Sequence, residues 1–212
     1  MSAANLRESS HEEHIAPAHG RVFSPKSRAQ FLYEEGELDF GQLNELEGGK
    51  LFPATRSGLA DPLAPDDVTN ATPPADGEIA SGGHTTDERA RLDDAGTHWR
   101  KHAVKSGQML EVTWGYSMPH KTRRWTYWLT QSGWNPHRQL ARDQFEADPL
   151  GIWLNEYRPY WGSDAEQELV PRNITRHELR LPQRNGYHVL LAVWDVADTG
   201  NAFYQVIDLM FE

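Results

Sequence analysis

Histidine is the residue type that could give this chain metal chemistry, because the sequence holds ten histidines and no cysteine. A neutral imidazole nitrogen is a common metal ligand. His98 and His102 are four residues apart and would share one face of a helix, yet no acidic partner is fixed beside them. His11 and His14 lie in a polar stretch, where they would bind metal only adventitiously. The histidines without any supporting motif are His84, His137, His177 and His188. Spacing alone therefore selects no metal site.

The elements that would position a site are clearest at the C-terminal end of the chain. Two strand-like runs, Tyr187–Val196 and Ala202–Phe211, flank a polar corner at Asp195–Asn201. The first run is almost wholly apolar, which is typical of a central strand covered on both faces. The second run alternates, with Phe203 and Tyr204 on opposite faces. These residues predict a β-hairpin with ordinary turn chemistry at its corner.

Earlier strands follow the same pattern. Leu110–Tyr116 and Trp125–Leu129 alternate between an inner and an outer face, and His177–Leu181 is a further short strand. Short strands separated by turn signals predict an all-β fold, an immunoglobulin- or fibronectin III-like β-sandwich. The residues expected to be buried in it are Trp114, Trp125, Val193 and Trp194.

A long stretch without alternation follows the first strand. From Gln30 to roughly Lys101 the chain holds proline and glycine clusters, and a capping box at Thr85–Glu88 precedes a short helical segment at Arg89–Ala95. So long a loop region is unusual in a plain sandwich. We therefore expect a large loop–helix insertion after the first strand.

The first 18 residues differ in composition from the rest of the chain. Residues 1–18 are polar and of mixed charge, and they lack the apolar core of a secretory signal peptide. Ala16-Pro17-Ala18, before His19, has the small-x-small form of a cleavage site. We expect a leader at residues 1–18, flexible or removed, and one domain at residues 19–212.

Composition excludes two classes of partner. The 212 residues carry a formal net charge of −10, so no basic stripe is present to neutralise the phosphates of a nucleic acid. No run approaches the roughly 20 apolar residues of a membrane span. The eight tryptophans are mostly what the core of a β protein would need.

Four separated stretches carry a resemblance to a known family. They are HGRVFSPKSRA (His19–Ala29), EGGKLFP with DGEIASGG (Glu47–Pro53 and Asp76–Gly83), SMPHKTRRWTYWLTQSGWNP (Ser117–Pro136), and WDVADTGNAFYQVIDL from Trp194 onward. In this order they closely resemble the bacterial lytic polysaccharide monooxygenases, whose module is also called the chitin-binding type-4 domain.

The resemblance implies a copper site of one ion per chain. In the family an N-terminal histidine supplies its α-amino and one ring nitrogen, and a second histidine supplies a third nitrogen; these positions match His19 and His120. Nitrogen ligands suit copper, which lies at the top of the divalent affinity series. Phe203 matches the aromatic residue that fills the axial side. Glu47 matches the glutamate that positions the oxygen species near the metal.

The resemblance also implies a substrate and its contacts. Ser117, Asp198 and Asn201 match polar residues of a flat face that binds an insoluble polysaccharide, chitin first and cellulose as the alternative. The implied protein is a secreted monomer that takes electrons from an external donor and binds neither nucleic acid nor membrane.

Three departures from the family pattern stand out. Relatives place a tyrosine shortly before the glutamate, where this chain has FGQLN at Phe40–Asn44. Relatives have a small residue two positions before the second histidine, where this chain has Met118; its thioether would crowd the open axial position or act as a weak soft ligand for Cu(I). Relatives commonly carry disulfides, so without cysteine packing alone must hold the long loops of this chain.

Two further functions stay open. If His19 is not the mature N-terminus, its backbone nitrogen is a peptide amide, and the chain would be a non-catalytic polysaccharide-binding module, an adhesin or a delivery cargo. A structural or spindle-type storage protein of the same superfamily is the third hypothesis.

Overall fold

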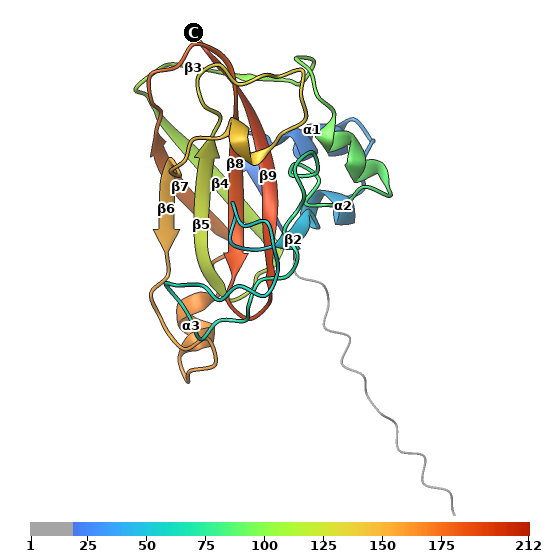
Figure 1. Ribbon diagram of the computed structural model, residues 1–212. Coiled ribbons are helices and arrows are strands. Elements are labelled where there is room, and N and C mark those ends of the chain that lie inside the picture. The colour runs from blue at the N-terminus through green and yellow to red at the C-terminus, as the bar shows by residue number, and fades with distance from the viewer. Residues whose placement is uncertain (1–18) are drawn as a thin grey trace, which may run out of the picture.

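The computed structural model describes residues 19–212, which form two packed β-sheets (Figure 1). The smaller sheet has the order β1 (His19–Ser24), β4 (Met109–Met118), β7 (Ile174–Arg180). The larger sheet has the order β2 (Glu47–Gly49), β9 (Asn201–Phe211), β8 (Gly186–Val196), β5 (Thr122–Leu129), β6 (Gly151–Leu154). β3 (His102–Val104) pairs in parallel with β9, and the other pairs are antiparallel. The predicted all-β sandwich is confirmed. The leader expected at residues 1–18 lies outside the described residues.

The central strand β8 is buried on both faces, as its apolar run predicts. Leu190, Ala192 and Trp194 point between the two sheets, into the core that also holds Trp114 and Phe203. The residues between them face the other way, toward the inserted segment after β1. The hairpin β8–β9 therefore belongs to two cores at once.

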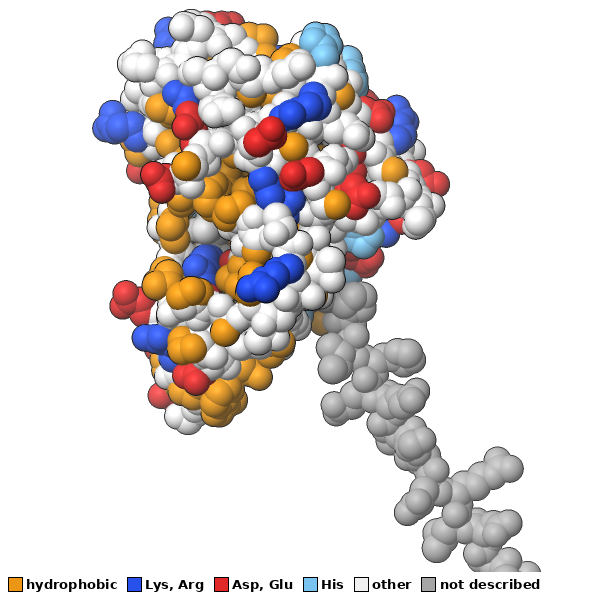
Figure 2. Space-filling model, viewed as in Figure 1, with side chains coloured by type: hydrophobic (Ala, Val, Ile, Leu, Met, Phe, Trp, Pro, Cys, Tyr) orange, Lys and Arg blue, Asp and Glu red, His pale blue; other side chains and the backbone are white. Residues whose placement is uncertain are grey.

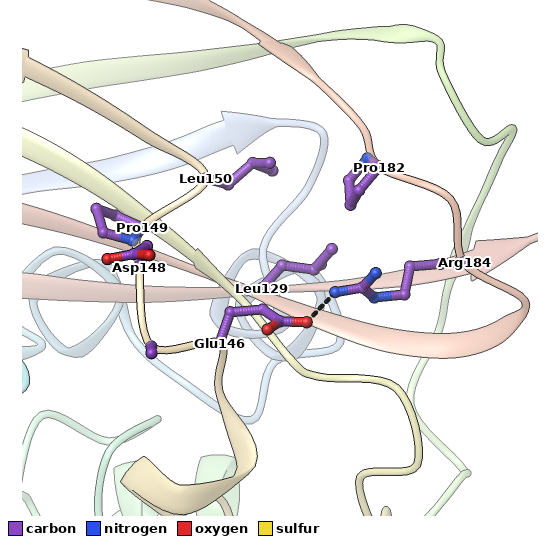
Figure 3. A pocket seen from close by; sticks show the side chains of 8 residues that line it. Leu129, Glu146, Asp148, Pro149, Leu150, Pro182 and Arg184 are labelled. Atoms are coloured by element: carbon purple, nitrogen blue, oxygen red, sulfur yellow. Dashed lines mark hydrogen bonds and ion pairs between the residues drawn. The ribbon is translucent and has the colours of Figure 1, made fainter.

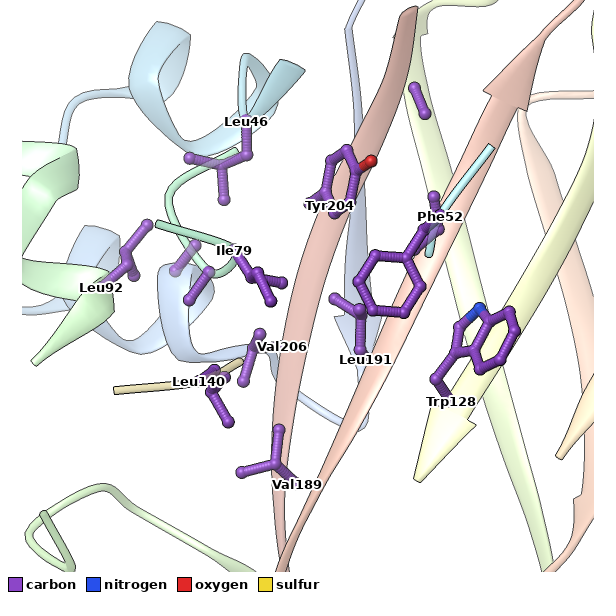
Figure 4. Packing of buried hydrophobic residues seen from close by; sticks show 14 of the residues in the cluster. Leu46, Phe52, Ile79, Leu92, Trp128, Leu140, Val189, Leu191, Tyr204 and Val206 are labelled. Atoms are coloured by element: carbon purple, nitrogen blue, oxygen red, sulfur yellow. The ribbon is translucent and has the colours of Figure 1, made fainter. Parts of the chain in front are cut away.

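The insertion forms a third layer over the outer face of the larger sheet. It contains α1 (Arg28–Glu34), α2 (Phe40–Asn44), β2 and a 3-10 turn, η1 (Glu88–Asp93). Leu46, Ile79 and Leu92 of this segment pack against Val206 and Tyr204 of β9 (Figure 4). Later in the chain, η2 (Arg142–Gln144) precedes β6, and α3 (Ala165–Leu169) lies at the end of the sandwich where the chain turns from β8 to β9 (Figure 1). The expected loop–helix insertion is present.

Local capping sets where the short helices begin. The Ser27 hydroxyl accepts from the backbone N–H of Gln30 at the start of α1, and Asp39 with Gln42 forms a capping box at the start of α2. The capping box predicted at Thr85–Glu88 is wrong in position. Asp87 caps the turn instead, because its carboxylate accepts from both the backbone and the side chain of Arg89, and the segment winds as a 3-10 turn.

One buried residue was also predicted wrongly. Trp114, Val193 and Trp194 are fully buried, but Trp125 is only partly so. It lies opposite Trp153 of the edge strand β6, where the sheet ends and less of the ring is covered. Its indole N–H donates to the Tyr116 hydroxyl at 3.0 Å.

Packing alone does not hold the long loops, contrary to expectation, because buried charges cross-link them. Arg123, 1% exposed, forks onto both oxygens of Asp67 in the insertion and also donates to the carbonyl oxygens of Asn155 and Tyr157. The Lys50 ammonium donates to the carbonyl of Val196 at 2.7 Å. Within residues 19–212, no helix is long and apolar enough to cross a membrane.

Gly20 gives a test of how tightly the end of the sandwich is packed. A Cβ atom there would lie 2.6 Å from the Trp194 ring, which is itself stacked on Phe203. We expect Gly20→Ala to lower the free energy of unfolding by about 1–3 kcal/mol, the usual cost of overpacking. Chemical denaturation measures it.

The matched control is Gly41→Ala within α2, where the nearest heavy atom to an added Cβ is an exposed Asp39 oxygen. Alanine is the better helix former, and the 3.2 Å contact with Asp39 is much milder than the contact at Gly20, so this change should lower stability far less than Gly20→Ala. Equal effects of the two substitutions would contradict the packing argument.

Candidate metal centre

Strand ends gather the candidate residues at one end of the sandwich. β1 pairs with β4 so that His19 lies opposite Met118, and His120 follows in the turn between β4 and β5. β2 pairs with β9 so that Glu47 lies opposite Phe203. Four segments far apart in sequence therefore meet at one place, although each is an ordinary strand end.

His120 is held against an aromatic wall. Its ring centroid lies 6.2 Å from that of Phe203 and 6.2 Å from that of Trp194. The last two rings are stacked at 4.7 Å, and Phe203 is fully buried. His120 and Phe203 therefore lie side by side, as the match of Phe203 to the aromatic residue of the family site implies. Thr122 connects the backbone of His120 to this wall. Its hydroxyl accepts a hydrogen bond from the Trp194 indole at 2.7 Å and donates one to the His120 carbonyl at 3.2 Å.

Each histidine ring presents one nitrogen to a carboxylate. His120 Nδ1 lies 3.7 Å from Asp198 Oδ1, which leaves Nε2 on the other side of the ring. His19 Nε2 lies 3.2 Å from Glu45 Oε1. The remaining nitrogen of His19, Nδ1, is buried and has no hydrogen-bond partner among the described residues. A carboxylate near one imidazole nitrogen is common in metal sites, where the other nitrogen binds the metal.

The acidic residue of the centre is fixed as well. Asn201 Nδ2 donates to Glu47 Oε1 at 2.7 Å, and a ring nitrogen of His84 lies 3.1 Å from the Glu47 carbonyl oxygen. Glu47 and Asn201 are both half-buried. The glutamate carboxylate is therefore positioned by a neighbour and still reaches solvent.

The electrostatics of His120 reflect this setting. Burial is the largest effect and lowers the pKa of its imidazole below the ordinary value. The carboxylates of Asp198 and Glu47 oppose the shift, and His19 adds to it. The ring is thus biased toward the neutral form that a metal requires.

These residues fit a nitrogen-bound metal, but not one held by three side chains. No group of three or more histidine, cysteine, aspartate or glutamate side chains within residues 19–212 could hold a metal ion. Two imidazoles with oriented nitrogens suit copper. A third nitrogen would have to be the backbone nitrogen of His19, which is an amide when Ala18 precedes it.

The other predicted residues lie at the rim of the candidate metal centre, around the two histidines. Ser117 and Met118 are exposed at the end of β4, with Met118 41% exposed. Asp198 and Asn201 are half-buried, and their side chains face His120 and Glu47. The site is not part of the cavity of about 370 Å³ in Figure 3, which lies by Leu129 at the far end of β5.

Sequence reasoning missed two neighbours of the histidines. Glu45, just past α2, faces His19. The two residues are far apart in the chain, so no local sequence pattern predicts that they pair. Trp194 packs against both His120 and Phe203. The apolar run Tyr187–Val196 predicts that Trp194 is buried, and its antiparallel pairing with Phe203 could have placed it at the centre.

The pKa of His120 tests the role of Asp198. Asp198→Asn removes the largest interaction that raises this pKa, so the imidazole of the metal-free protein should titrate at a lower pH than in the parent. NMR titration of the ring protons, assigned with His120→Gln, measures the shift.

Asp143→Asn is the control, because Asp143 is exposed near the far end of β5. It should leave the His120 titration unchanged. A rise in the His120 pKa in the Asp198→Asn variant would show that Asp198 does not face the ring.

Comparison with known proteins supports the fold and identifies the family. A family model described as "Lytic polysaccharide mono-oxygenase, cellulose-degrading" matches residues 19–209. A chitin-binding domain from Burkholderia pseudomallei superposes with a TM-score of 0.91 at 67% identity, covering 92% of this chain and all of that one. A Bacillus amyloliquefaciens CBM33 protein in complex with Cu(I) superposes with a TM-score of 0.67 at 34% identity, covering 92% of this chain and all of that one.

Among curated relatives, the "Lytic chitin monooxygenase" of Enterococcus faecalis is 34% identical over 197 residues, which is 92% of this chain and 86% of that protein. The chain spans only 26% to 36% of the length of the first curated relatives it matches, each named "GlcNAc-binding protein A". The family match covers nearly all the described residues. The chain belongs to the lytic polysaccharide monooxygenase family.

Proposed function

We propose that this chain cleaves chitin oxidatively, with one copper ion held by His19 and His120. The observation that carries the proposal is the pair of oriented imidazoles, with the His19 Nδ1 buried and unpartnered among the described residues. Copper bound there supplies one-electron redox chemistry toward an oxygen-derived oxidant, the chemistry needed to break a C–H bond beside a glycosidic linkage. Electrons come from an external donor.

The chain's own residues then have distinct roles. Asp198 places a negative charge 3.7 Å from His120 Nδ1, and Phe203 with Trp194 excludes water from one side of the ring. Glu47, held by Asn201, accepts or returns a proton at its carboxylate close to the reacting atoms. Ser117, Asp198 and Asn201 offer hydrogen bonds to sugar hydroxyl or acetamido groups at the rim.

Chitin is the proposed substrate, and cellulose is the alternative. The printed names of the relatives point to chitin or N-acetylglucosamine, whereas the family description prints cellulose. The polymer is insoluble, so we propose that the protein acts outside the cell, as a monomer, with residues 1–18 removed and residues 19–212 as the working domain.

A binding-only function is the second candidate, and the sequence itself favours testing it. In the chain that begins at Met1, the backbone nitrogen of His19 is a peptide amide with no basic lone pair. That form lacks the third nitrogen ligand. It would bind the polysaccharide without cutting it.

Maturation decides between the two functions. A free α-amine has a pKa near ~8, so copper displaces its proton at neutral pH far more easily than that of an amide. The 19–212 form should bind Cu(II) tightly and release oxidised oligosaccharides from chitin when given a reductant. The 1–212 form should bind weakly and oxidise chitin slowly or not at all. Calorimetric copper titration and product mass spectrometry measure both.

His120→Ala in the 19–212 form should remove tight copper binding, and His137→Ala, at an exposed histidine outside the centre, should leave it intact. If the 19–212 form binds copper and oxidises chitin no better than the full chain, the enzymatic function is refuted and the binding-only function is favoured. Intact-mass measurement of the natural protein shows which form exists.

Met118 gives a separate test of where the oxidant forms. Met118 lies opposite His19 in the β1–β4 pair and is 41% exposed, so its thioether should be converted to the sulfoxide during turnover. Peptide mapping of the inactivated enzyme measures this. Met118→Ala should change the rate of self-inactivation.

Met109 is the internal reference, because it is exposed at the opposite end of β4. It should remain largely unoxidised. Equal oxidation of the two methionines, together with unchanged inactivation of Met118→Ala, would make Met118 an ordinary surface residue.

A further inference from the structure

Trp161 is the one exposed tryptophan of the eight, all of which lie within residues 19–212. It is 61% exposed, the largest fraction among the exposed large hydrophobic side chains of the described residues. The others are buried or partly buried, as core filling requires. An indole left in solvent in this way is not explained by the core.

The loop that carries Trp161 is held rigidly in place. The buried Arg123 guanidinium donates to the carbonyl oxygens of Asn155 and Tyr157, at the start of the loop. The Tyr157 hydroxyl accepts from the backbone N–H of Asp164 at 3.1 Å, which closes the loop around Trp161. A side chain at Gly162 would meet that hydroxyl at 2.5 Å, so the backbone packs directly on it. The Trp161 side chain is therefore presented by an ordered support.

The support borders the candidate metal centre. Ala165 and Leu169 of α3 pack on Ala197, the residue before Asp198. Lys121, which follows His120, has its ammonium 3.9 Å from a carboxylate oxygen of Glu166. Figure 1 shows α3 at the same end of the sandwich as the turn between β8 and β9. The loop of Trp161 and the two histidines therefore share one end of the molecule.

The chemistry of this position suits a sugar ring. Tyr160 backs Trp161, with the ring centroids 4.8 Å apart and the planes at 84°, which leaves the indole in a fixed orientation. Exposed polar residues flank it, namely Ser163, Asp164 and Glu166. A single aromatic surface bordered by hydrogen-bonding groups matches a pyranose, which has apolar C–H faces and a rim of hydroxyl groups. It does not match the broad apolar patch of a stable protein–protein interface.

We infer that Trp161 is a second contact for the polysaccharide, stacking on a pyranose ring of the same β-1,4-glycan surface that meets His19 and His120. The inference rests on the proposed function, since it takes the same polymer as ligand. It adds a binding residue from the segment between β6 and β7, which none of the four family-like stretches includes.

Binding of the metal-free full chain to chitin, measured as an adsorption isotherm in the presence of a chelator, tests the inference apart from oxidation. Trp161→Ala should raise the dissociation constant about ten-fold, the effect of losing one exposed aromatic anchor. Trp161→Tyr should retain most of the affinity. Met109→Ala removes an exposed apolar side chain at the opposite end and should change nothing.

The outcomes separate the two proposals. If the parent binds neither chitin nor cellulose, the proposed function fails, and this inference falls with it. If the parent binds and Trp161→Ala binds equally well, only the inference is wrong. Thermal melting checks that the alanine variant is folded. If it is not, the same binding measurement is made with Trp161→Leu, which keeps apolar bulk but has no ring. A change in sedimentation without a change in chitin binding would assign Trp161 to self-association and overturn the inference.

Discussion

The structure depends on one strand pair, β8 with β9, because it is the only pair whose two faces are both buried along their length within the described residues. On one face lies the core between the sheets, and on the other lies the core under the insertion. At one end of this strand pair, Trp194 stacks on Phe203, and the two rings form the aromatic wall against which His120 lies. The candidate metal centre is therefore built on the end of the most deeply buried strand pair of the described residues.

The aromatic wall covers one side of His120, and a carboxylate lies beside each of the two imidazoles. Glu45 and Asp198 come from different layers, one just past α2 in the insertion and the other from the turn after β8. Each carboxylate faces a ring nitrogen, so the electrostatic surroundings of the two rings come from both layers. This explains why the insertion matters to a site whose histidines belong to the sandwich. The α2 segment is short, but its capping box fixes its first turn, and Glu45 is its C-cap.

Much of this could be predicted from the sequence, and the failures have physical causes. The strands β4, β5 and β9 follow from alternation and β8 follows from its continuous apolar run, because one or both faces of each are buried. The site residues followed from motifs, not from spacing: His19 and His120 look like any other histidine until the segments around them are matched. Glu45 could not be predicted, since an ion pair between distant segments leaves no local pattern. Trp161 was equally hidden, because a count of tryptophans does not distinguish the core from the surface.

The absence of cysteine shows how the long loops are held by other means. Arg28 forks onto Asp208 of β9 and donates to the carbonyl of Leu92, so one buried side chain ties α1, η1 and the central hairpin together. Arg123 does the same for the insertion and the loop of Trp161. Each such group is costly to bury, yet removing one partner of a buried pair costs more, about 3–5 kcal/mol, because a charge is left unpaired. Loops held in this way do not depend on an oxidising compartment. The segment that Arg123 supports leads to α3, which packs on Ala197 beside Asp198, so these buried contacts also support one edge of the candidate site.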